Sequence, residues 1–421
     1  MAEEKAYDQA ARTGKYEKAS GLSGKYDNVR RFWEDQLTGI FLRPALNDLV
    51  QYKRESLERL RILDLGCGSG DGFDLIMGIT AKDPGLYEYI HQTITPDMLQ
   101  SYVGIDVNDN LLQQAREHYG HLSKLSFKKH DLTQGMPTGS ESENPYDIYL
   151  TSYGTMSHFN HKTSVKIVSE ILKHAPERAV FIGDWLGRYS YEWVDLWGQS
   201  PDDEFFMDYR ISYIYPPEER NSVEIPIFPL RLMTKNEILA IVEDAAAQTG
   251  VSIKPLCFFD RSILVGRHLE TGDYNKNCPD LRLPINSLFE GYVRTDLERL
   301  LVDFVPRPGF DHLNNFFESF FMSTNTLVEH TIAMLAGHEN GTLSPRIESF
   351  YPGPLKEAIN TMRHVIEAAG KLHYGDPRAN MIEPHLGYSL RKLEMELQPG
   401  TGMGHSLVGV FEINKSKGKQ H

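Results

Sequence analysis

The amino-acid sequence predicts an α/β protein: a doubly wound, mostly parallel seven-stranded sheet with an antiparallel terminal hairpin, followed by a mainly helical C-terminal region. Three observations predict this fold. Short apolar runs alternate with helical stretches between about residues 60 and 185, which is typical of βαβ units. Two further strand-like runs, 251–259 and 261–268, are separated only by the link at Asp260 and Arg261. Because so short a link cannot join parallel strands, we expect the two runs to form an antiparallel hairpin. Beyond residue 285, apolar residues recur mainly at helical spacing.

The chain of 421 residues is long enough for two or three domains. We expect an N-terminal helical cover over 1–57, an α/β domain over 58–268 and a mainly helical domain over 285–421. An aromatic-rich stretch, 185–217, follows the fifth strand and is interpreted as an insertion into the α/β domain. Residues 269–285 contain Gly, Asn, Pro and Asp and are interpreted as a linker.

Each element of the α/β domain has a local signal. Helices are expected at 110–118 and 161–175, between the strands. Thr234 and Glu237 have the spacing of a capping box, which predicts a helix over 235–247. The five expected parallel strands lie at 61–66, 101–107, 125–129, 146–152 and 178–184.

Composition excludes several classes of function. The chain has 44 Lys and Arg against 58 Asp and Glu, a formal net charge of −14, which argues against nucleic acid as a partner. Cys67, Cys257 and Cys278 are odd in number and far apart, which favours a reducing compartment, and no metal site is expected. Because no run of about 18 apolar residues occurs, we expect no membrane association and a cytoplasmic location.

The most informative segment is the glycine-rich run 62–72, where a strand leads through a glycine turn into a helix. This arrangement lets the backbone approach a nucleotide-like ligand. A dinucleotide fingerprint requires G-x-G-x-x-G/A. Counting from Gly66 puts Asp71 in the sixth place, and counting from Gly68 puts Phe73 there. Neither count fits, and an aspartate would place negative charge beside a pyrophosphate, so the expected ligand carries no phosphate at this loop.

The pattern D-x-G-x-G-x-G after a strand resembles that of class I S-adenosylmethionine-dependent methyltransferases, and the resemblance covers about residues 58–268. Further acidic residues stand in the order that this family shows. The resemblance implies that Asp106 binds the ribose hydroxyls and that Asp131, followed by Leu132, receives the adenine amino group. The loop residues implied in cofactor binding are Asp64, Gly66, Gly68 and Gly70.

The resemblance implies methyl transfer by direct displacement, with S-adenosylmethionine as the cofactor. The segment that follows the fourth strand, 151–159, has no [DNS]-P-P-[YF] tetrad and no cysteine, so a small-molecule acceptor methylated on O, N, S or C is favoured. His158 is a candidate general base, because its charge changes near neutral pH, or it is a structural residue at the start of the next helix. Tyr153 either orients the acceptor or packs.

Aromatic residues are dense over 185–217, which follows the fifth strand at the edge where open α/β folds bind ligands. This segment is interpreted as a lid over the substrate, with Trp185, Arg188 and Tyr189 as candidate substrate contacts; the alternative is that its rings only pack. Tyr26 and Arg30 in the N-terminal cover are candidates for binding the methionine carboxylate, or belong to an exposed basic turn.

The helical region leaves the function open to alternatives. Its apolar stripes predict burial against the α/β domain, among themselves or in a homodimer. It is also compatible with a protein or RNA methyltransferase that docks its substrate there, although the acidic charge argues against RNA. A non-catalytic cofactor-binding scaffold is a third reading. A nicotinamide oxidoreductase is disfavoured by the glycine count.

Overall fold

A computed structural model gives the structure of the protein. It describes residues 7–8, 22, 24–83, 85–137, 144–200, 204–337, 351–372 and 375–415.

Five parallel strands form one half of the central sheet, in the order β3-β2-β1-β4-β5. All five coincide with strands that the sequence predicts. Each is a short apolar run, and parallel strands buried on both faces need little polar alternation. Their bounds are β1 (Leu60–Leu65), β2 (Leu99–Asp106), β3 (Leu125–Lys129), β4 (Ile148–Leu150) and β5 (Arg178–Gly187).

The other half of the sheet corrects the predicted hairpin. An antiparallel pair does end the sheet, but β8 (Ser252–Arg261) pairs with β9 (Ser406–Asn414), and residues 262–268 form no strand. Asp260 and Arg261 are the last residues of β8 and not a turn. β9 lies between β5 and β8 and is antiparallel to both. A local pattern can predict an antiparallel neighbour, but it cannot show that the partner comes from the far end of the chain.

A short ribbon adds two strands at the end of β5. β7 (Ile227–Met233) pairs in parallel with Leu186 and Gly187 of β5, and β6 (Phe206–Arg210) pairs antiparallel with β7. The described sheet therefore has nine strands, seven of them in the core that the sequence predicts. β6 lies inside the aromatic segment 185–217, which is thus partly an extension of the sheet.

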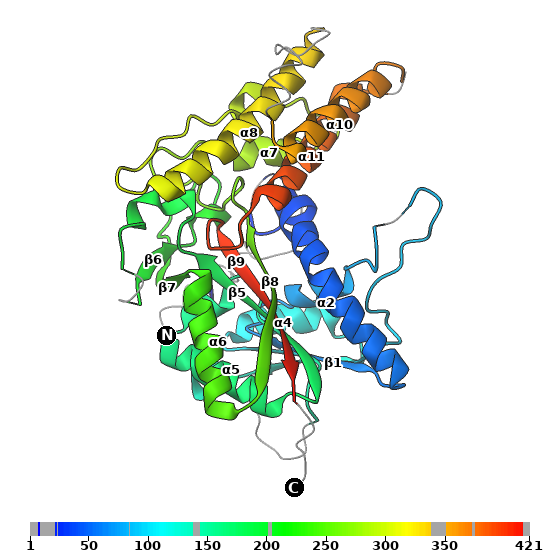
Figure 1. Ribbon diagram of the computed structural model, residues 1–421, viewed down its shortest axis with the longest axis vertical. Helices are drawn as coiled ribbons and strands as arrows, with labels where there is room; N and C mark the ends of the chain where they lie inside the picture. The colour runs from blue at the N-terminus through cyan, green and yellow to red at the C-terminus, as the bar shows by residue number, and fades with distance from the viewer. Residues whose placement is uncertain are drawn as a thin grey trace.

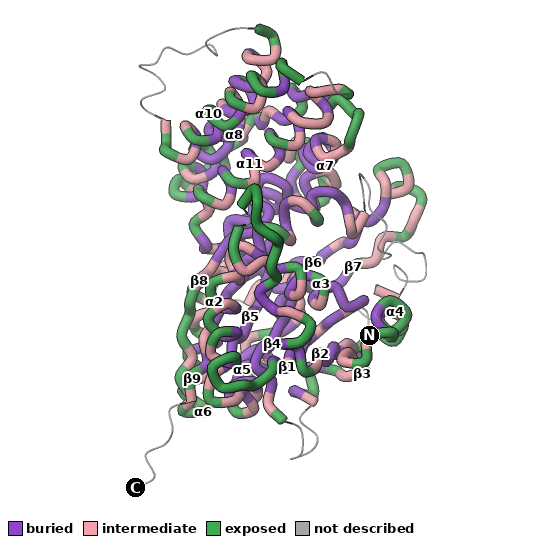
Figure 2. The backbone as a smooth tube through the Cα atoms, turned by 90° about the vertical axis from the view of Figure 1, so that its right-hand side faces the viewer, coloured by how far each residue is buried: buried purple, intermediate pink, exposed green. Residues whose placement is uncertain are grey.

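Helices cover both faces of the sheet (Figures 1 and 2). α5 (His161–His174) and α6 (Lys235–Thr249) bury Leu63 and its neighbours on one face. α2 (Asp35–Glu55) packs on the opposite face, where Ile62 points. The capping box that opens α6 is confirmed. Two shorter helices flank the parallel strands, α3 (Asp71–Met77) and α4 (Asp109–Tyr119).

The mainly helical region is an insertion between β8 and β9, and the predicted C-terminal domain over 285–421 needs correction because residues 406–414 belong to the sheet. Figure 1 shows its helices grouped at one end of the molecule, above the sheet. Their apolar faces join the core on the α2 side of the sheet. The helices are α7 (Arg282–Ser287), α8 (Asp311–Leu335), α10 (Gly353–Ala369) and α11 (Glu383–Leu397).

Short helical turns connect these elements. No helix within the described ranges is long and apolar enough to span a membrane. The turns are η1 (Arg30–Glu34), η2 (Leu132–Gln134), η3 (Thr155–His158), η4 (Tyr191–Leu196), η6 (Ser212–Ile214), η7 (Leu297–Leu300) and η8 (Arg378–Ile382).

Candidate functional site

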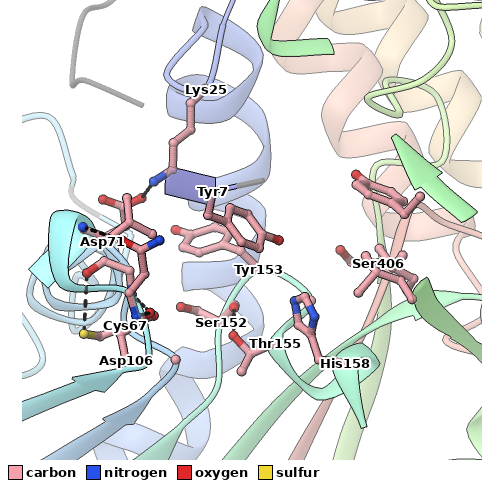
Figure 3. A pocket seen from close by; sticks show the side chains of 18 of the residues that line it. Tyr7, Lys25, Cys67, Asp71, Asp106, Ser152, Tyr153, Thr155, His158 and Ser406 are labelled. Atoms are coloured by element: carbon pink, nitrogen blue, oxygen red, sulfur yellow. Dashed lines mark hydrogen bonds and ion pairs between the residues drawn. The ribbon is translucent and has the colours of Figure 1, made fainter. Parts of the chain in front are cut away.

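A cavity of about 320 Å³ lies where the parallel strands end. Its walls come from the segments that follow β1, β2, β3 and β4, from the N-terminal segment before α2, and from the start of β9. Open α/β sheets bind ligands at this edge. Figure 3 shows the cavity with Asp106 and Cys67 on one side, Ser406 on the other, and Thr155 and His158 between them.

The glycine turn after β1 forms one wall. Gly66 and Gly68 both line the cavity and have positive φ angles of 76° and 51°. A Cβ on Gly66 would lie 2.5 Å from Cγ2 of Thr155, so a larger residue does not fit there. Gly70 also has a positive φ but does not line the cavity; its absent side chain makes room for the ring of Tyr119. The turn thus presents backbone to a ligand at two of its three predicted glycines.

Asp106 lies at the end of β2 with its carboxylate directed to the glycine turn. Oδ2 accepts the backbone N–H of Gly68 at 2.8 Å, and Oδ1 accepts that of Asn108 at 2.8 Å. Burial raises the pKa of this carboxyl. Each oxygen retains a second lone pair, so the group can still accept hydrogen bonds from a vicinal diol in the cavity.

Asp131 and Leu132 line the cavity after β3, as predicted. The carboxylate of Asp131 is exposed, and its Oδ1 accepts the N–H and the hydroxyl of Thr133 at 2.9 and 2.7 Å. Leu132 faces the same cavity as Val107 and Leu111. These side chains give this end of the cavity an apolar slot with a carboxylate at its rim, which suits a flat heterocycle with an amino group.

Asp64 does not line the cavity, which corrects its predicted direct contact with a ligand. It is fully buried within β1, where its Oδ2 accepts the hydroxyl of Tyr102. Burial raises the pKa of Asp64 to about 7. A Cβ on Gly72 would lie 2.3 Å from Oδ2, so the carboxylate packs beneath the start of α3. Its role is therefore to support the glycine turn from below.

The N-terminal segment reaches the cavity through Arg30. The guanidinium is 2% exposed and donates from Nε to Oδ1 of Asp35 at 3.1 Å. Tyr26 does not line the cavity; its ring lies 5.2 Å from the Arg30 guanidinium carbon. The structure therefore places Arg30 in the wall of the cavity and Tyr26 next to Arg30, outside the lining.

Lys25 is a cavity residue that the sequence analysis missed. Its Nζ lies 2.7 Å from Oδ2 of Asp71 and 3.2 Å from the hydroxyl of Ser69, on the glycine turn. Burial lowers the pKa of this amine. Figure 3 shows Lys25 reaching from the N-terminal segment to Asp71. Lys25 belongs to no periodic pattern, so only the fold shows that it reaches the turn.

Tyr153 and His158 both line the cavity after β4, as predicted. Tyr153 has a φ of 57°; its N–H donates to Asp184 at 2.8 Å and its hydroxyl to Asp35 at 3.1 Å. His158 lies on η3, and its ring stacks on Phe228 with a centroid distance of 5.8 Å. The structure brings both side chains to the cavity, while their chemical roles stay predictions.

Trp185, Arg188 and Tyr189 do not line the cavity, which corrects their prediction as substrate contacts. β5 extends to Gly187, three residues beyond the predicted end, so Trp185 lies within the sheet and is fully buried in its core. Arg188 donates to both carboxylate oxygens of Glu237 at 3.1 and 2.6 Å, joining β5 to the first turn of α6. Tyr189 packs against the core.

Other aromatic residues of the segment 185–217 do reach the cavity. Tyr209 on β6 and Tyr213 on η6 line it. Trp193 and Trp197 are buried in the core instead, and the indole N–H of Trp193 donates to the carbonyl of Gly187 at 3.0 Å. The segment therefore covers one end of the cavity with two tyrosines and anchors itself with two tryptophans.

The end of the cavity opposite the glycine turn contains residues that the sequence analysis did not select. Arg261 ends β8, Arg267 follows it, and His405 and Ser406 open β9. The glycine-rich run 400–405 was the available signal. Its position beside the cavity follows from the pairing of β9 with β5, which no local pattern predicts.

The helices α7, α8, α10 and α11 of the insertion contribute none of the described lining residues, but they brace the wall. Arg282 of α7 donates to Glu34 at 2.9 Å and to Asp27, and Arg267 donates to Glu34 at 2.7 Å. Burial alone would raise the pKa of Glu34, but the guanidinium groups of Arg267, Arg282 and Arg261 outweigh it and hold this pKa well below its usual range. The insertion thus holds the N-terminal segment against the sheet.

Comparison with known proteins gives only distant likenesses. No family model and no curated protein matches the chain. Among solved structures, the chain is similar to an S-adenosylmethionine-dependent methyltransferase from Clostridium acetobutylicum, with 13% identity, 60% of this chain and 90% of the other covered, and a TM-score of 0.36. It is also similar to a methyltransferase of this kind from Aquifex aeolicus, with 17% identity, 52% of this chain and 87% of the other covered, and a TM-score of 0.28. A TehB-like methyltransferase from Corynebacterium glutamicum has 12% identity, 61% of this chain and 87% of its own chain covered, and a TM-score of 0.29.

The topology of the chain describes its fold independently of these likenesses. Its core sheet runs β3-β2-β1-β4-β5-β9-β8, with β9 antiparallel among parallel strands and a glycine turn after β1 beside an acidic residue that ends β2. This strand order and this turn form the doubly wound, mostly parallel α/β fold that the sequence predicts.

Proposed function

We propose that this protein is an S-adenosylmethionine-dependent methyltransferase that acts on a small molecule. The observation that carries the proposal is the contact between Asp106 and Gly68 at the carboxyl edge of the sheet. The carboxylate holds the turn by one hydrogen bond and keeps lone pairs free toward the cavity. This is the arrangement that a nucleoside needs when no phosphate is bound at the turn.

The residues present fit S-adenosylmethionine along the cavity. Asp106 would accept the ribose hydroxyls, and the apolar slot of Leu111 and Leu132 would hold the adenine. Lys25 and Arg30 would face the methionine carboxylate, because both cations lie beside the glycine turn. When bound, the cofactor supplies an electrophilic methyl group on a sulfonium. The protein then has to align the acceptor with that group and exclude water.

A small acceptor is favoured by the far end of the cavity. Tyr209, Tyr213 and Leu230 line it together with His158, and these side chains close over a space of limited size. The helices α7, α8, α10 and α11 contribute none of the described lining residues. The net charge of −14 also opposes RNA binding.

Two measurements test the proposal. Titration calorimetry should show one S-adenosylmethionine site per chain. Incubation with methyl-labelled S-adenosylmethionine and a cell extract should then place the label in the small-molecule fraction. Label in the protein or RNA fraction would show that the acceptor is a protein or an RNA. Cofactor binding without any labelled product would favour the scaffold reading, and absence of binding would refute the site.

The homodimer and the cytoplasmic location stay predictions. The apolar stripes of α8 and α11 that suggested a dimer are buried within one chain, with Leu386, Leu390 and Leu393 each at most 1% exposed. Because these stripes are already covered, they do not require a second subunit. Mass measurement by light scattering at micromolar concentration decides between monomer and dimer.

A further inference from the structure

The glycine-rich turn before β9 is rigidly held and is not a loose connection. The fully buried carboxylate of Asp260 accepts the backbone N–H groups of Thr401, Gly402 and Met403 at 3.0, 2.8 and 2.9 Å. A Cβ on Gly404 would lie 2.5 Å from the carbonyl oxygen of Arg261, so glycine is required for this close approach. The turn therefore places the next residue, His405, with little freedom.

His405 is paired with a buried carboxylate. Its Nδ1 lies 2.7 Å from Oε2 of Glu192, and the two residues are 7% and 1% exposed. The same carboxylate accepts the N–H of His268 and the hydroxyl of Ser190. A Cβ on Gly266 would come 2.2 Å from Cδ of Glu192, so the chain leaves room for this carboxylate. Because a carboxylate only accepts, Nδ1 carries the proton and Nε2 presents a lone pair.

Nε2 is the ring nitrogen of His405 that does not contact Glu192. His405 and Tyr209 both line the cavity, and Nε2 lies 3.5 Å from the Tyr209 hydroxyl. Burial raises the pKa of Tyr209 well above its usual range, so this hydroxyl keeps its proton. At 3.5 Å the contact is long for a hydrogen bond, so an acceptor hydroxyl that comes closer to Nε2 can take its place.

The other titratable neighbours leave this arrangement intact. The ring of His268 stacks near that of His405, with a centroid distance of 6.1 Å. Burial holds the pKa of His268 well below its usual range, so His268 is uncharged. The indole of Trp193 packs on a third side, 5.4 Å away. Glu192 is thus the charged group in direct contact with the imidazole.

We propose that Glu192 and His405 form the general-base pair of the acceptor site and that the acceptor is a hydroxyl-bearing small molecule. The inference rests on the proposed methyl transfer. As the acceptor oxygen forms a bond to the methyl carbon, the carbon–sulfur bond breaks and its electron pair stays on sulfur. The hydroxyl proton passes to Nε2 of His405, and the imidazolium is stabilised by Glu192 until the proton returns to solvent.

The class of acceptor follows from the base. A neutral amine attacks through its own lone pair and can lose its proton afterwards, whereas a hydroxyl is a poor nucleophile until its proton leaves. Leu186, Leu230 and Tyr213 line the same cavity, and so do the polar residues Arg261, Arg267 and Ser406. The expected acceptor is therefore a hydroxyl compound that has both apolar and polar parts.

The pair Glu192 and His405 also differs from the base that the sequence predicts. His158 stacks on Phe228 and interacts electrostatically with Asp106, the residue assigned here to the ribose. His405 instead contacts the carboxylate of Glu192, which is not assigned to the cofactor. On this assignment His158 is a lining residue, and Figure 3 shows it between Thr155 and Ser406.

The decisive variant is His405→Asn, whose amide can still donate to Glu192 while the lone pair of Nε2 is lost. Its affinity for S-adenosylmethionine by calorimetry and its thermal midpoint should match those of the wild type. Transfer to the labelled product of the extract, or to a panel of phenols, should fall by about 10²–10⁴-fold. The matched control is His161→Asn, since His161 pairs with Asp244 at 2.8 Å outside the cavity and its loss should not change the transfer rate.

A second measurement does not depend on turnover. In nitrogen-detected NMR, His405 should be the tautomer with the proton on Nδ1. In Glu192→Gln the pKa of His405 should fall, because removing a neighbouring negative charge disfavours the imidazolium. The acid limb of the pH–rate profile should move to lower pH by the same amount.

The outcomes are distinct. Wild-type protein that does not bind S-adenosylmethionine refutes the proposed function and the base pair with it. Binding and transfer with an undiminished rate in His405→Asn refute the base pair alone. A product methylated on nitrogen or sulfur refutes the hydroxyl acceptor, and an unchanged histidine pKa in Glu192→Gln refutes the coupling of the two residues.

Discussion

The guanidinium carbon of Arg30 lies 3.5 Å from the centroid of the Tyr153 ring. Arg30 precedes the sheet in the chain and Tyr153 follows β4, so this stack closes the N-terminal segment over the cavity. Oδ1 of Asp35 accepts a hydrogen bond from Nε of Arg30 at 3.1 Å and another from the Tyr153 hydroxyl at 3.1 Å. The stack is largely shielded from water, where a cation over an aromatic ring contributes most.

Arg30→Ala should therefore weaken both the fold and cofactor binding. Loss of the stack and of the contact with Asp35 should cost about 2 kcal/mol of unfolding free energy. Urea denaturation measures this loss, and calorimetry should show weaker binding of S-adenosylmethionine. Arg31→Ala is the control, because Arg31 lies over the ring of Phe32 but is exposed. Equal effects in the two variants would contradict the closing role of Arg30.

Asp106→Ala tests the assignment of the ribose site. Hydrogen bonds to a charged group contribute about 1.5–3 kcal/mol, which corresponds to a loss of roughly 10- to 150-fold in affinity. Calorimetry with S-adenosylmethionine measures it directly. Asp109→Ala lies three residues away on the exposed start of α4 and should bind as the wild type does. Unchanged affinity in Asp106→Ala would remove the observation on which the proposed function rests.

Gly68→Val tests the glycine turn. The residue lines the cavity with a φ of 51°, so a branched side chain would strain the backbone and enter the space of the ligand. We expect S-adenosylmethionine binding to be lost. Gly272→Val has a similar φ of 63° but open space around it, so it should share the strain and retain binding. If both variants bind equally well, the turn does not contact the cofactor.

Asp64→Asn should change how stability depends on pH. The folded-state pKa of Asp64 is about 7 against an ordinary value of 3.8, so the folded protein holds a proton there that the unfolded chain has released. Stability from this group is complete below about pH 4 and is lost as the pH rises through 7, by up to about 4 kcal/mol. Urea midpoints at pH 5 and pH 8 should differ less in the variant. An identical pH dependence would show that Asp64 does not titrate in this range.

Truncation tests the place of β9. A chain ending at His268 contains every element of the predicted α/β domain but lacks β9, which pairs with both β5 and β8. It should fail to fold, as judged by circular dichroism and limited proteolysis. A chain ending at Lys415 retains β9 and should unfold at the temperature of the full chain. A cooperative folded state in the shorter chain would show that the sheet closes without β9.

The sequence predicts those parts of the fold and site that depend on local signals. The five parallel strands, the capping box of Thr234 and the placement of Gly68, Asp106 and Asp131 all follow from patterns within a few residues. The prediction for Arg188 was wrong because an arginine after the expected end of a strand suggests a contact with a ligand. The structure lengthens the strand and pairs the side chain with Glu237 instead.

Other parts depend on contacts between distant segments. Lys25 reaches Asp71, and His405 reaches Glu192, only after the sheet has assembled. Neither contact leaves a mark in the neighbouring sequence. For the same reason the partner of β8 could not be identified, since any alternating run in the chain satisfies the requirement for an antiparallel neighbour.

The position of β9 also sets an order of events during synthesis. A strand from the end of the chain fills a gap inside the sheet, so β5 and β8 emerge from the ribosome with that gap still open. At about 5–20 residues per second, the roughly 140 residues of the insertion delay β9 by about 7–28 s. Unpaired strand edges exposed for so long attract other chains. We therefore expect the nascent protein to need chaperone protection until β9 arrives, and the site to form only after residues 405–414 have been synthesised.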